Sequence, residues 1–582
     1  MARLAVAVTA LLAASGTVDA SPASLRCKAH PSCRWPPQQE WELFNKTVQG
    51  HLLAPPPPAG VCHTNQKTYN ADQCAAVTKE WPDMNFHIEN PVSLFMNQFN
   101  NDTCLPDPKA PCSDAGYPSR VVDARSVKDV EAAVRFARTN ALRLIVKSTG
   151  HDYQGRSSAP GALSVWVHHL DSINYRPGPF KLSGSGRSID GNVVVVGGGA
   201  QMGNIANVLS KVNQTIVSGQ ALTVSVGGYI TGGGHSALSP KFGMAADNVV
   251  EMQVVLPTGE TVMANQDTNK DIYWAVLGGG GSTFGVVTEY VIKTHPSPKI
   301  FGISLILFML QKNDTIASEV LGSFSSFIPD MMDAGLAGYM VLGAGLDSPS
   351  PYLPPSIDGF EGQLALFDKG EAEWNAIIRP FNETLNTRFK GQAKLIAITQ
   401  EYNSYNDWLQ VVADRNPAGV NAWMASRLLD KEALSNQEVM GKTLWSAGSN
   451  PDASSVFFFL VGGKGVAANK GLNAVNPAWR SAYVHTITVS GFAPLNETAA
   501  KHSADVVDSL YQPLRDLTPN GGAYINEAFH FEKNWQKTFW GDNYDRLLQI
   551  KRRVDPDDVF WCAPCVGNER WQQDKTGKLC RV

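Results

Sequence analysis

The stretch KSTGHDYQG, residues 147–155, places a histidine directly after a glycine, where a run of apolar residues gives way to a turn. A histidine in this position has four possible uses. It can be a structural turn residue, a general base, a metal ligand or a point of covalent attachment. The rest of the chain must decide among them.

Several familiar motifs are incomplete. Two glycine-rich runs, GGGAQMG at 197–203 and GGGSTFG at 279–285, each have one residue too many for the dinucleotide fingerprint. The GKT at 441–443 resembles the end of a Walker A loop, but Asn436 stands where the first glycine of that loop belongs. We therefore expect no nucleotide hydrolysis.

Metal and hydrolase signatures are missing as well. The chain has no H-E-x-x-H and no G-x-S-x-G sequence. The pair His168-His169 falls on alternating faces of an expected strand, so only one ring could face a site. Cys562 and Cys565 have the spacing of a redox motif, but they lack the strand and helix of a thioredoxin-like unit, which favours a structural role. We expect no metal site.

The elements around His151 form a β-α-β beginning. VVDA at 121–124 is typical of a short strand, and residues 126–142 predict an amphipathic helix that begins after Ser126. LRLIVK at 142–147 predicts a buried strand that leads into the Gly-His turn. His151 thus follows the end of a strand in an α/β arrangement.

Glycine clusters interrupt the strands that follow. They occur at 197–199, 227–228, 232–234 and 278–281. A single cluster can serve only to make a tight turn, but several beside apolar strands indicate close approach of the backbone to a ligand. A large polyphosphate ligand is the usual reason.

Changes in composition and residue pattern divide the chain into five parts. Residues 1–20 resemble a signal peptide, and 21–112 form a segment rich in Pro, Cys and Asn with short helices at most. Residues 113–296 carry the glycine clusters. Residues 297–510 alternate apolar strands with helical runs, which predicts an α+β domain with an antiparallel sheet. Residues 511–582 contain an amphipathic helix at 543–554.

The length of the chain and its net charge limit the number of domains and the kinds of partner that are possible. With 582 residues, two or three domains are expected, and a net charge of −4 gives no basic field for nucleic acid. We expect no nucleic-acid partner and no membrane span. The oligomeric state is left open, and a monomer is favoured.

The N-terminus predicts export. Arg3 precedes the apolar run LAVAVTALLAA, which is too short for the roughly 20 residues of a membrane span. Six N-x-S/T sequences suit a secreted glycoprotein, at Asn45, Asn101, Asn213, Asn313, Asn382 and Asn496.

All nine cysteines lie outside the middle of the chain. Six precede it and three follow it, at Cys27, Cys33, Cys62, Cys74, Cys104, Cys112, Cys562, Cys565 and Cys580. In an oxidising compartment, these predict disulfides that staple the N-terminal segment to itself or to the C-terminus, with at least one cysteine left over. The connectivity cannot be read from the sequence.

Four motifs in order carry a family resemblance. They are KSTGHDYQGRS at 147–157, the glycine-rich stretch at 223–255, GGGGSTFGVVT at 278–288 and the aromatic-rich stretch at 524–562. Together they resemble the berberine-bridge-enzyme-like FAD-linked oxidases of the vanillyl-alcohol-oxidase and p-cresol-methylhydroxylase superfamily, in particular the secreted fungal members. The resemblance implies an α+β fold with a two-part FAD-binding domain and a substrate domain.

The resemblance implies FAD as cofactor. In this family the histidine of the Gly-His motif bonds to the 8α-methyl group of the flavin, and His151 holds that position. Many relatives add a cysteinyl bond, but here Ala221 stands at that position, which implies a single covalent link. The residues that the resemblance assigns to flavin binding are His151, Ser148, Thr149, Gly150, Asp152, Thr223, Val224, Gly227, Gly228, Thr231, Gly232, His235, Val286, Val287 and Tyr524. For the two β-strand valines at 286 and 287, simple burial explains the pattern equally well.

The resemblance also suggests the catalytic residues. Tyr524-Ile525-Asn526 matches the Y-x-N motif of the family, and on a strand both polar side chains would face the flavin while Glu527 would face away and be structural. Tyr524 is then either the base or a hydroxyl that orients the substrate, and Asn526 a hydrogen-bond donor. Tyr229 is a second candidate base.

The implied reaction is oxidation of a small molecule with O2 as acceptor. A base removes a proton while hydride passes to the flavin, and H2O2 forms. The aliphatic Val224, near the face that oxygen approaches in the family, favours an oxidase. The substrate is expected to be an alcohol, a phenolic or a carbohydrate hydroxyl. A flavin dehydrogenase or tailoring enzyme of secondary metabolism, and a catalytically silent secreted flavoprotein, remain as alternatives.

Overall fold

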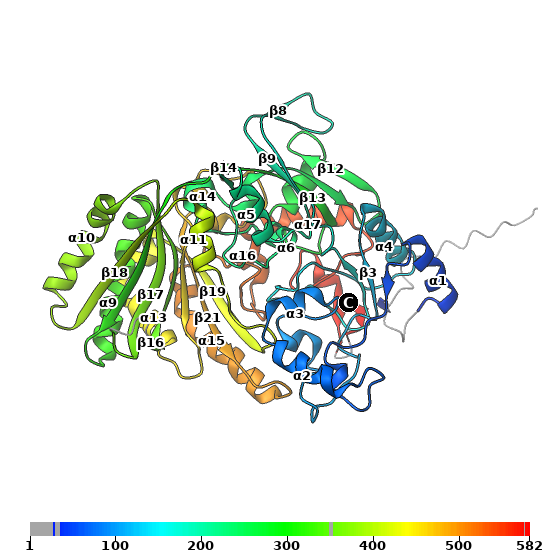
Figure 1. Cartoon of the computed structure of the whole chain (residues 1–582), viewed down its shortest axis with the longest axis horizontal. Helices are drawn as coiled ribbons and strands as arrows, with labels where there is room; N and C mark the ends of the chain where they lie inside the picture. Colours follow the sequence, from blue (N-terminus) through cyan, green and yellow to red (C-terminus); the bar gives the residue numbers. More distant parts are fainter. Residues whose placement is uncertain (1–26, 29–34, 348–352, 575–576) are drawn as a thin grey trace, which may run out of the picture.

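The computed structural model of the chain describes residues 27–28, 35–347, 353–574 and 577–582. The expected signal peptide at 1–20 and Cys33 lie outside the described residues. Within these ranges, no helix combines the length and the apolar character that crossing a membrane requires. The elements form two parts that lie side by side, with the substrate domain on the left of Figure 1.

A small sheet carries the Gly-His turn. The strands run in the order β2-β3-β5-β4, and β3, β5 and β4 are parallel. Their bounds are Leu52–Leu53, Arg120–Asp123, Leu163–Trp166 and Leu144–Lys147. Helix α4, Val127–Thr139, connects β3 to β4 and begins with a capping box between Ser126 and Asp129. The β-α-β prediction is confirmed, because the apolar face of α4 and the strands share one buried core.

A second sheet of five antiparallel strands completes the flavin-binding part. The order is β12-β11-β13-β9-β6. The strands are Thr261–Asn265, Val249–Val255, Val286–Lys293, Val193–Gly197 and Ile173–Arg176. Helices α5 (Met202–Ser210), α6 (Val226–Gly232) and α8 (Lys270–Val276) follow or join these strands. Three of the four glycine clusters lie where β9, α6 and α8 end and in the turns that follow, whereas Gly227 and Gly228 lie within α6.

The substrate domain is built on a seven-stranded antiparallel sheet. Its order is β18-β15-β17-β16-β20-β21-β19. The strands are Ala393–Tyr402, Ile300–Met309, Ser356–Phe367, Leu336–Asp347, Val456–Leu460, Ala482–Gly491 and Ala422–Asp430. Helices cover one face, where they bury a large apolar core with every second side chain of the strands. They are α9 (Asp314–Asp333), α10 (Glu371–Thr387), α13 (Gln437–Gly448) and α15 (Glu497–Leu517). Side chains on the other face of the sheet, among them Tyr339 and Phe459, pack against the flavin-binding part.

Helix α15 crosses the boundary expected at residue 510. It packs along β19 and β21, so the helix belongs to the substrate domain to its end at Leu517. The chain then returns to the flavin-binding part through α16 (Trp535–Trp540) and α17 (Tyr544–Val554). Near the termini, β1 (Cys27–Lys28) pairs with β23 (Leu579–Arg581), which also pairs with β22 (Trp571–Gln573).

The N-terminal segment is a disulfide-stapled segment with short helices, as the composition predicted. It contains α1 (Gln38–Thr47), α2 (Ala71–Glu80) and α3 (Met84–Glu89). Two disulfides, Cys62–Cys74 and Cys104–Cys112, staple the segment to itself. In Figure 1, the blue helices α2 and α3 lie beneath the junction of the two domains. The segment therefore contributes to the region between the domains.

Candidate active site

The Gly-His turn is fixed on both sides. The Nε2 atom of His151 lies 2.8 Å from the Thr223 hydroxyl, and its ring packs against Phe95 with 3.9 Å between centroids. Burial, together with the nearby charge of Lys147, lowers the pKa of His151 to about 3. The imidazole is therefore neutral at physiological pH.

Lys147 anchors this turn to the N-terminal segment. Its side chain is buried, and Nζ donates to the backbone oxygens of Asn90 at 2.7 Å and His87 at 3.2 Å. These carbonyls lie at and just past the end of α3. The N-terminal segment is thus held directly against the strand that presents His151.

A cavity of about 570 Å³ opens beside this turn, between the two domains. Most of the residues expected to bind flavin line it: Ser148, Thr149, Gly150, His151, Asp152, Val224, Gly227, Gly228, Thr231, His235, Val286, Val287 and Tyr524. Ala221, Tyr229 and Asn526 line it as well. The sequence motifs, which are far apart along the chain, therefore meet at one cavity.

Two of the expected residues do not line the cavity but support residues that do. Thr223 holds His151 through its hydroxyl group. Gly232 leaves room for Asn526, since a Cβ atom at position 232 would lie only 2.4 Å from Asn526 Nδ2. Thr223 and Gly232 therefore lie directly behind residues that line the cavity.

The cavity suits an extended ligand rich in hydrogen-bond acceptors. Ser148 Oγ and Arg156 Nη1 are buried donors without a partner in the protein, and both residues line the cavity. A Cβ atom on Gly228 would project into open space, so the backbone is exposed to a ligand there. A flavin with its diphosphate supplies acceptors of this kind.

A chain of polar contacts links the turn to the Y-x-N motif. Arg156 pairs with Asp152 in a contact of 2.5 Å and donates through Nη2 to Asn526 Oδ1 at 2.7 Å. The bond to Arg156 fixes the orientation of the Asn526 amide, because only an oxygen can accept from a guanidinium. The Nδ2 atom of Asn526 then donates to the Tyr524 hydroxyl at 2.8 Å. Arg156 belongs to the first motif, KSTGHDYQGRS, but no pattern in the sequence indicates a role for it.

The hydroxyl oxygen of Tyr524 is a fixed acceptor. Besides Asn526, the backbone N–H of Gly234 acts on it and favours the phenolate, as does the charge of Arg156. Burial and the negative charge of Glu527 act more strongly in the opposite direction, and the pKa of Tyr524 lies well above its usual value. The state of Glu527 therefore affects the ionisation of Tyr524.

The strand prediction for the Y-x-N motif is wrong. Residues 523–530 contain no strand, and 524–527 form a turn in which the Glu527 N–H donates to the Tyr524 carbonyl at 2.9 Å. Tyr524 and Asn526 still meet, but Glu527 also faces the cavity instead of pointing away. The period of two did not apply because this segment pairs with no strand and packs in the junction between the domains.

Tyr229 is not placed to act as a base. Its hydroxyl proton is directed at backbone oxygens, those of His235 at 2.8 Å and Val217 at 3.2 Å. Burial, with the neighbouring Tyr524 and other groups, raises the pKa of Tyr229 well above its usual value. Tyr229 thus supports the backbone at His235 and Val217, and Tyr524 remains as the candidate base.

One carboxylate oxygen of Glu527 lies within hydrogen-bond distance of two histidine rings. Its Oε2 atom lies 3.1 Å from His235 Nε2 and 2.9 Å from His485 Nε2. Burial opposes ionisation of Glu527, but the two histidines outweigh it, so the pKa of this carboxyl lies well below its usual range. Burial lowers the pKa of His485, against the pull of Glu527. No pattern in the sequence singles out His485, which is one position in an apolar strand.

Two groups of described residues have a composition suited to metal binding. His63 lies beside Cys104 and Cys112, but these cysteines form a disulfide and offer no thiolate. In the other group, His235, His485 and Glu527, both histidine Nδ1 atoms are buried without a partner. Histidines that bind metals usually donate this second nitrogen to an acceptor. The cluster lacks that support.

The substrate domain presents an apolar wall to the cavity. Tyr339, Phe457, Phe459, Ile487 and Met424 project from β16, β20, β21 and β19 toward the cavity. The N-terminal segment adds Met84, Phe95 and Met96 to the lining. The acidic residue among the loops of this side is Asp414, whose pKa is raised by burial and by Glu527. Most of the surface available to a substrate is therefore apolar.

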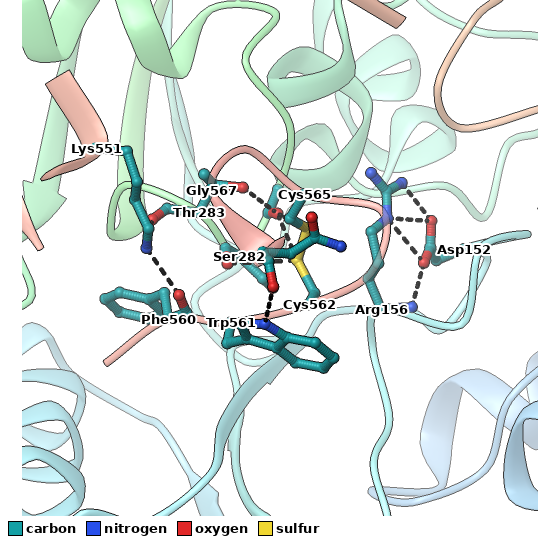
Figure 2. The surroundings of a disulfide bond; sticks show 12 residues. Asp152, Arg156, Ser282, Thr283, Lys551, Phe560, Trp561, Cys562, Cys565 and Gly567 are labelled. Atoms are coloured by element: carbon teal, nitrogen blue, oxygen red, sulfur yellow. Dashed lines mark hydrogen bonds and ion pairs between the residues drawn. A yellow bond between two sulfur atoms is a disulfide. The ribbon is translucent and has the colours of Figure 1, made fainter. Parts of the chain in front are cut away.

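The Cys562–Cys565 disulfide supports the opposite wall. Its sulfur atoms lie 3.5–3.8 Å from the backbone oxygens of Gly281 and Ser282, which line the cavity. Figure 2 shows the bridge beside Ser282, with Lys551 donating to the Phe560 oxygen nearby. The bridge is buried, which agrees with the structural role expected for the motif.

Comparison with known proteins gives the class and the family. Residues 118–265 match the family model described as "FAD binding domain", and 523–566 match "Berberine and berberine like". The fold and the cavity define a flavoprotein of the vanillyl-alcohol-oxidase and p-cresol-methylhydroxylase type. The crystal structure of the VAO-type flavoprotein MtVAO713 from Myceliophthora thermophila C1 superimposes with a TM-score of 0.89 at 27 % identity, covering 96 % of this chain and 100 % of that one.

The curated relatives extend over the same length. The VAO-type flavoprotein oxidase VAO615 of Thermothelomyces thermophilus is 33 % identical, over 95 % of this chain and 96 % of its own. The bifunctional decalin synthase calF of Penicillium decumbens is 32 % identical, over 96 % of each chain. The chain belongs to the berberine-bridge-enzyme-like FAD-linked oxidoreductases, and it is an enzyme of that family.

Proposed function

We propose that the protein oxidises a hydroxyl group of an apolar alcohol or phenolic small molecule and passes the electrons to O2, giving H2O2. The observation that carries this proposal is the Tyr524 oxygen. It is held by Asn526 Nδ2 at 2.8 Å and by the Gly234 N–H, in the same cavity as His151. A phenolate with two fixed donors is a suitable acceptor for a substrate proton.

The cofactor would be held by the Gly-His turn and the glycine loops. We propose a single covalent bond from His151 to the flavin, because its imidazole is neutral and Ala221 cannot form a second bond. Because the Thr223 hydroxyl donates to Met84 Sδ, its oxygen accepts from His151 Nε2, which leaves the lone pair for attack on Nδ1. Ser148 and Arg156 offer the unpartnered donors for flavin oxygens, and Gly227 and Gly228 the exposed backbone.

The protein groups then have distinct tasks. Bound FAD would supply the hydride acceptor and the reaction with O2. Tyr524 receives the hydroxyl proton of the substrate, and Asn526 stabilises the charge on the phenol oxygen. Arg156 keeps the Asn526 amide in the orientation in which it donates. The apolar wall orients the substrate and excludes water from the site.

The apolar wall favours an apolar or phenolic substrate over a carbohydrate. A sugar presents several hydroxyl groups that each need a hydrogen-bond partner when buried. The strands facing the cavity offer aromatic and aliphatic side chains instead, among them Phe457, Phe459 and Ile487. A screen should therefore compare apolar alcohols and phenolics with oligosaccharides.

An oxidative tailoring reaction in secondary metabolism is the second candidate. The relative from Penicillium decumbens is named a decalin synthase, and a wide apolar cavity suits a polyfunctional natural product. Such a reaction can use the same proton acceptor, Tyr524. Product analysis separates ring formation from simple oxidation of a hydroxyl group.

The test is a substrate screen coupled to peroxide detection, in air and with a dye acceptor. Turnover that produces peroxide supports the oxidase, whereas turnover with the dye alone would point to a dehydrogenase. A yellow protein that forms no sulfite adduct and cannot be photoreduced would favour a silent flavoprotein. Flavin fluorescence on a denaturing gel, followed by mapping of the labelled peptide, tests the bond to His151.

We also propose that the protein is secreted and glycosylated. The sequence signals for export agree with exposed positions for four of the six N-x-S/T asparagines, Asn101, Asn213, Asn313 and Asn496. N-terminal sequencing of protein from the culture medium tests the cleavage near Ala20. A shift in mass after glycosidase treatment tests the sugars.

A further inference from the structure

A loop of the substrate domain borders the cavity and is tied to the flavin-binding part. It joins α11 (Tyr405–Val412) to β19. Gln220 Nε2 donates to the Val412 oxygen at 2.5 Å, and the Asp414 N–H donates to the Gln220 oxygen at 3.3 Å. Asp414, which lines the cavity, is therefore held beside Ala221.

The Asp414 carboxylate has few partners in the protein. Its Oδ1 atom accepts from the Asn416 N–H at 2.9 Å. Among the residues that the structure describes, no lysine, arginine or histidine forms an ion pair with Asp414, and no group donates to its Oδ2 atom. Burial raises the pKa of this carboxyl, against the effect of the Asn416 N–H. A half-buried carboxyl group therefore faces the cavity without a charged partner.

The other two carboxylates of the cavity wall are paired. Asp152 forms an ion pair with Arg156, and Glu527 accepts hydrogen bonds from two histidine rings. In the described lining, three carboxylates face one guanidinium, which leaves an excess of negative charge at Asp414. A carboxylate removed from water without a partner is costly, and a ligand group that pairs with it offsets that cost.

The flavin proposed above does not supply this partner. Thr223, in the turn after Ala221, contacts His151, so Asp414 lies toward the part of the cavity near the Gly-His turn. A flavin bonded through its 8α-methyl group has its dimethylbenzene ring at this end, and that ring carries no N–H or O–H group. The N–H group of the isoalloxazine is at the opposite end of the ring system. The Asp414 carboxylate is therefore left for the substrate.

Asp414 and the proposed proton acceptor border the same space. Asp414 and Tyr524 both line the cavity of about 570 Å³. Asp414 and Glu527 act on each other electrostatically, and both act on Tyr153, another residue of the cavity wall. One small molecule can thus place a hydroxyl group at Tyr524 and a second polar group at Asp414, while the apolar wall contacts the rest of it.

We propose that Asp414 is a substrate-recognition residue that binds a protonated amine. This inference rests on the proposed function and narrows its substrate class to apolar alcohols or phenolics that carry a basic nitrogen. An ammonium group both neutralises a carboxylate and donates hydrogen bonds to it, whereas a hydroxyl group only donates. Hydrogen bonds that involve ionised groups are roughly twice as strong as neutral ones, which favours the amine.

The test uses straight-chain amino alcohols, from aminopropanol to aminooctanol, each compared with the alkanol in which a methyl group replaces the ammonium. The range of lengths covers different spans between Tyr524 and Asp414. Each probe is mixed with the holoenzyme anaerobically at neutral pH, where the amines are protonated. Kd is taken from the concentration dependence of flavin reduction when the probe is oxidised, and from the perturbed flavin spectrum when it is not. Binding is therefore measured even if the proposed oxidation fails.

In the wild type, at least one amino alcohol should bind about 10- to 150-fold more tightly than its alkanol, as expected for a hydrogen bond to a charged group. Asp414→Asn keeps the size of the side chain and the acceptor for the Asn416 N–H, but it should abolish this preference. The control is Asp452→Asn, which removes an exposed carboxylate paired with His502 and should keep the preference. Flavin content and thermal midpoint check that both variants are folded.

Four results would overturn the inference. In the wild type, no amino alcohol of any length binds more tightly than its alkanol, a comparison that needs no variant. The preference persists in Asp414→Asn, which would mean that another group binds the amine. A diol binds as tightly as the amino alcohol of the same length, which would make Asp414 an acceptor for any donor. Asp414→Asn loses flavin at an unchanged thermal midpoint, which would assign the carboxylate to the cofactor.

Discussion

Replacement of Asn526 tests the proposed role of Tyr524 most directly. In the structure, Asn526 donates to the Tyr524 oxygen at 2.8 Å and accepts from Arg156 at 2.7 Å. A hydrogen bond to a charged group contributes about 1.5–3 kcal/mol. At about 1.36 kcal/mol for each factor of ten, Asn526→Ala should slow flavin reduction about 10- to 150-fold.

Asn526→Asp sharpens the test. The aspartate would keep the partnership with Arg156 but could not donate to Tyr524, and its charge would oppose the phenolate. We expect Asn526→Asp to be at least as slow as Asn526→Ala, although it should retain more stability. The assay is stopped-flow reduction of the flavin under anaerobic conditions, with flavin content and thermal midpoint as controls for folding. A variant Asn526→Asp that reduces at the wild-type rate would refute the role given to the amide donor.

Three further predictions follow from the cavity. His151→Ala should release the flavin on denaturation. In the wild type, the rate of covalent flavin incorporation into the apoprotein should stay level from pH 8 down to pH 5, because a pKa of about 3 keeps the His151 ring neutral throughout. A decline of this rate with a midpoint near the pKa of a free imidazole would contradict the prediction. Joint replacement of Cys562 and Cys565 by serine should lower the free energy of unfolding by about 2 kcal/mol, seen as a lower thermal midpoint, and an unchanged midpoint would argue against a supporting role. Phe457→Gln should raise KM for an apolar alcohol several-fold while kcat changes little, since the side chain lines the cavity but touches no proposed proton acceptor; a loss confined to kcat would place Phe457 in the chemistry.

Much of the fold could be predicted from local patterns. The helix after Ser126 has its capping box and its apolar face written in consecutive residues, and the strand before His151 is a plain apolar run. The same holds for the long strands of the substrate domain, whose alternate side chains separate the helix-covered face from the cavity. Such elements depend on periodicity, which is a property of the sequence alone.

The Y-x-N motif shows where this reasoning failed. The spacing of Tyr524 and Asn526 predicted a shared face, and they do meet, but in a turn rather than on a strand. The strand rule therefore assigned Glu527 to the wrong side. The conformation of this segment is set by the two domains that enclose it, and no local pattern encodes those contacts.

The sequence by itself determined the family, the Gly-His turn that contains His151 and the alanine at position 221, because these depend on residue types at fixed local spacing. Only the tertiary structure decided which side chains meet in the cavity. Arg156 reaches Asn526 across 370 positions of the chain, and Glu527 joins His235 and His485 across 292 and 42 positions. Contacts between residues so far apart are created by the packing of the domains, and they bring Arg156, Asn526 and Glu527 together around the cavity.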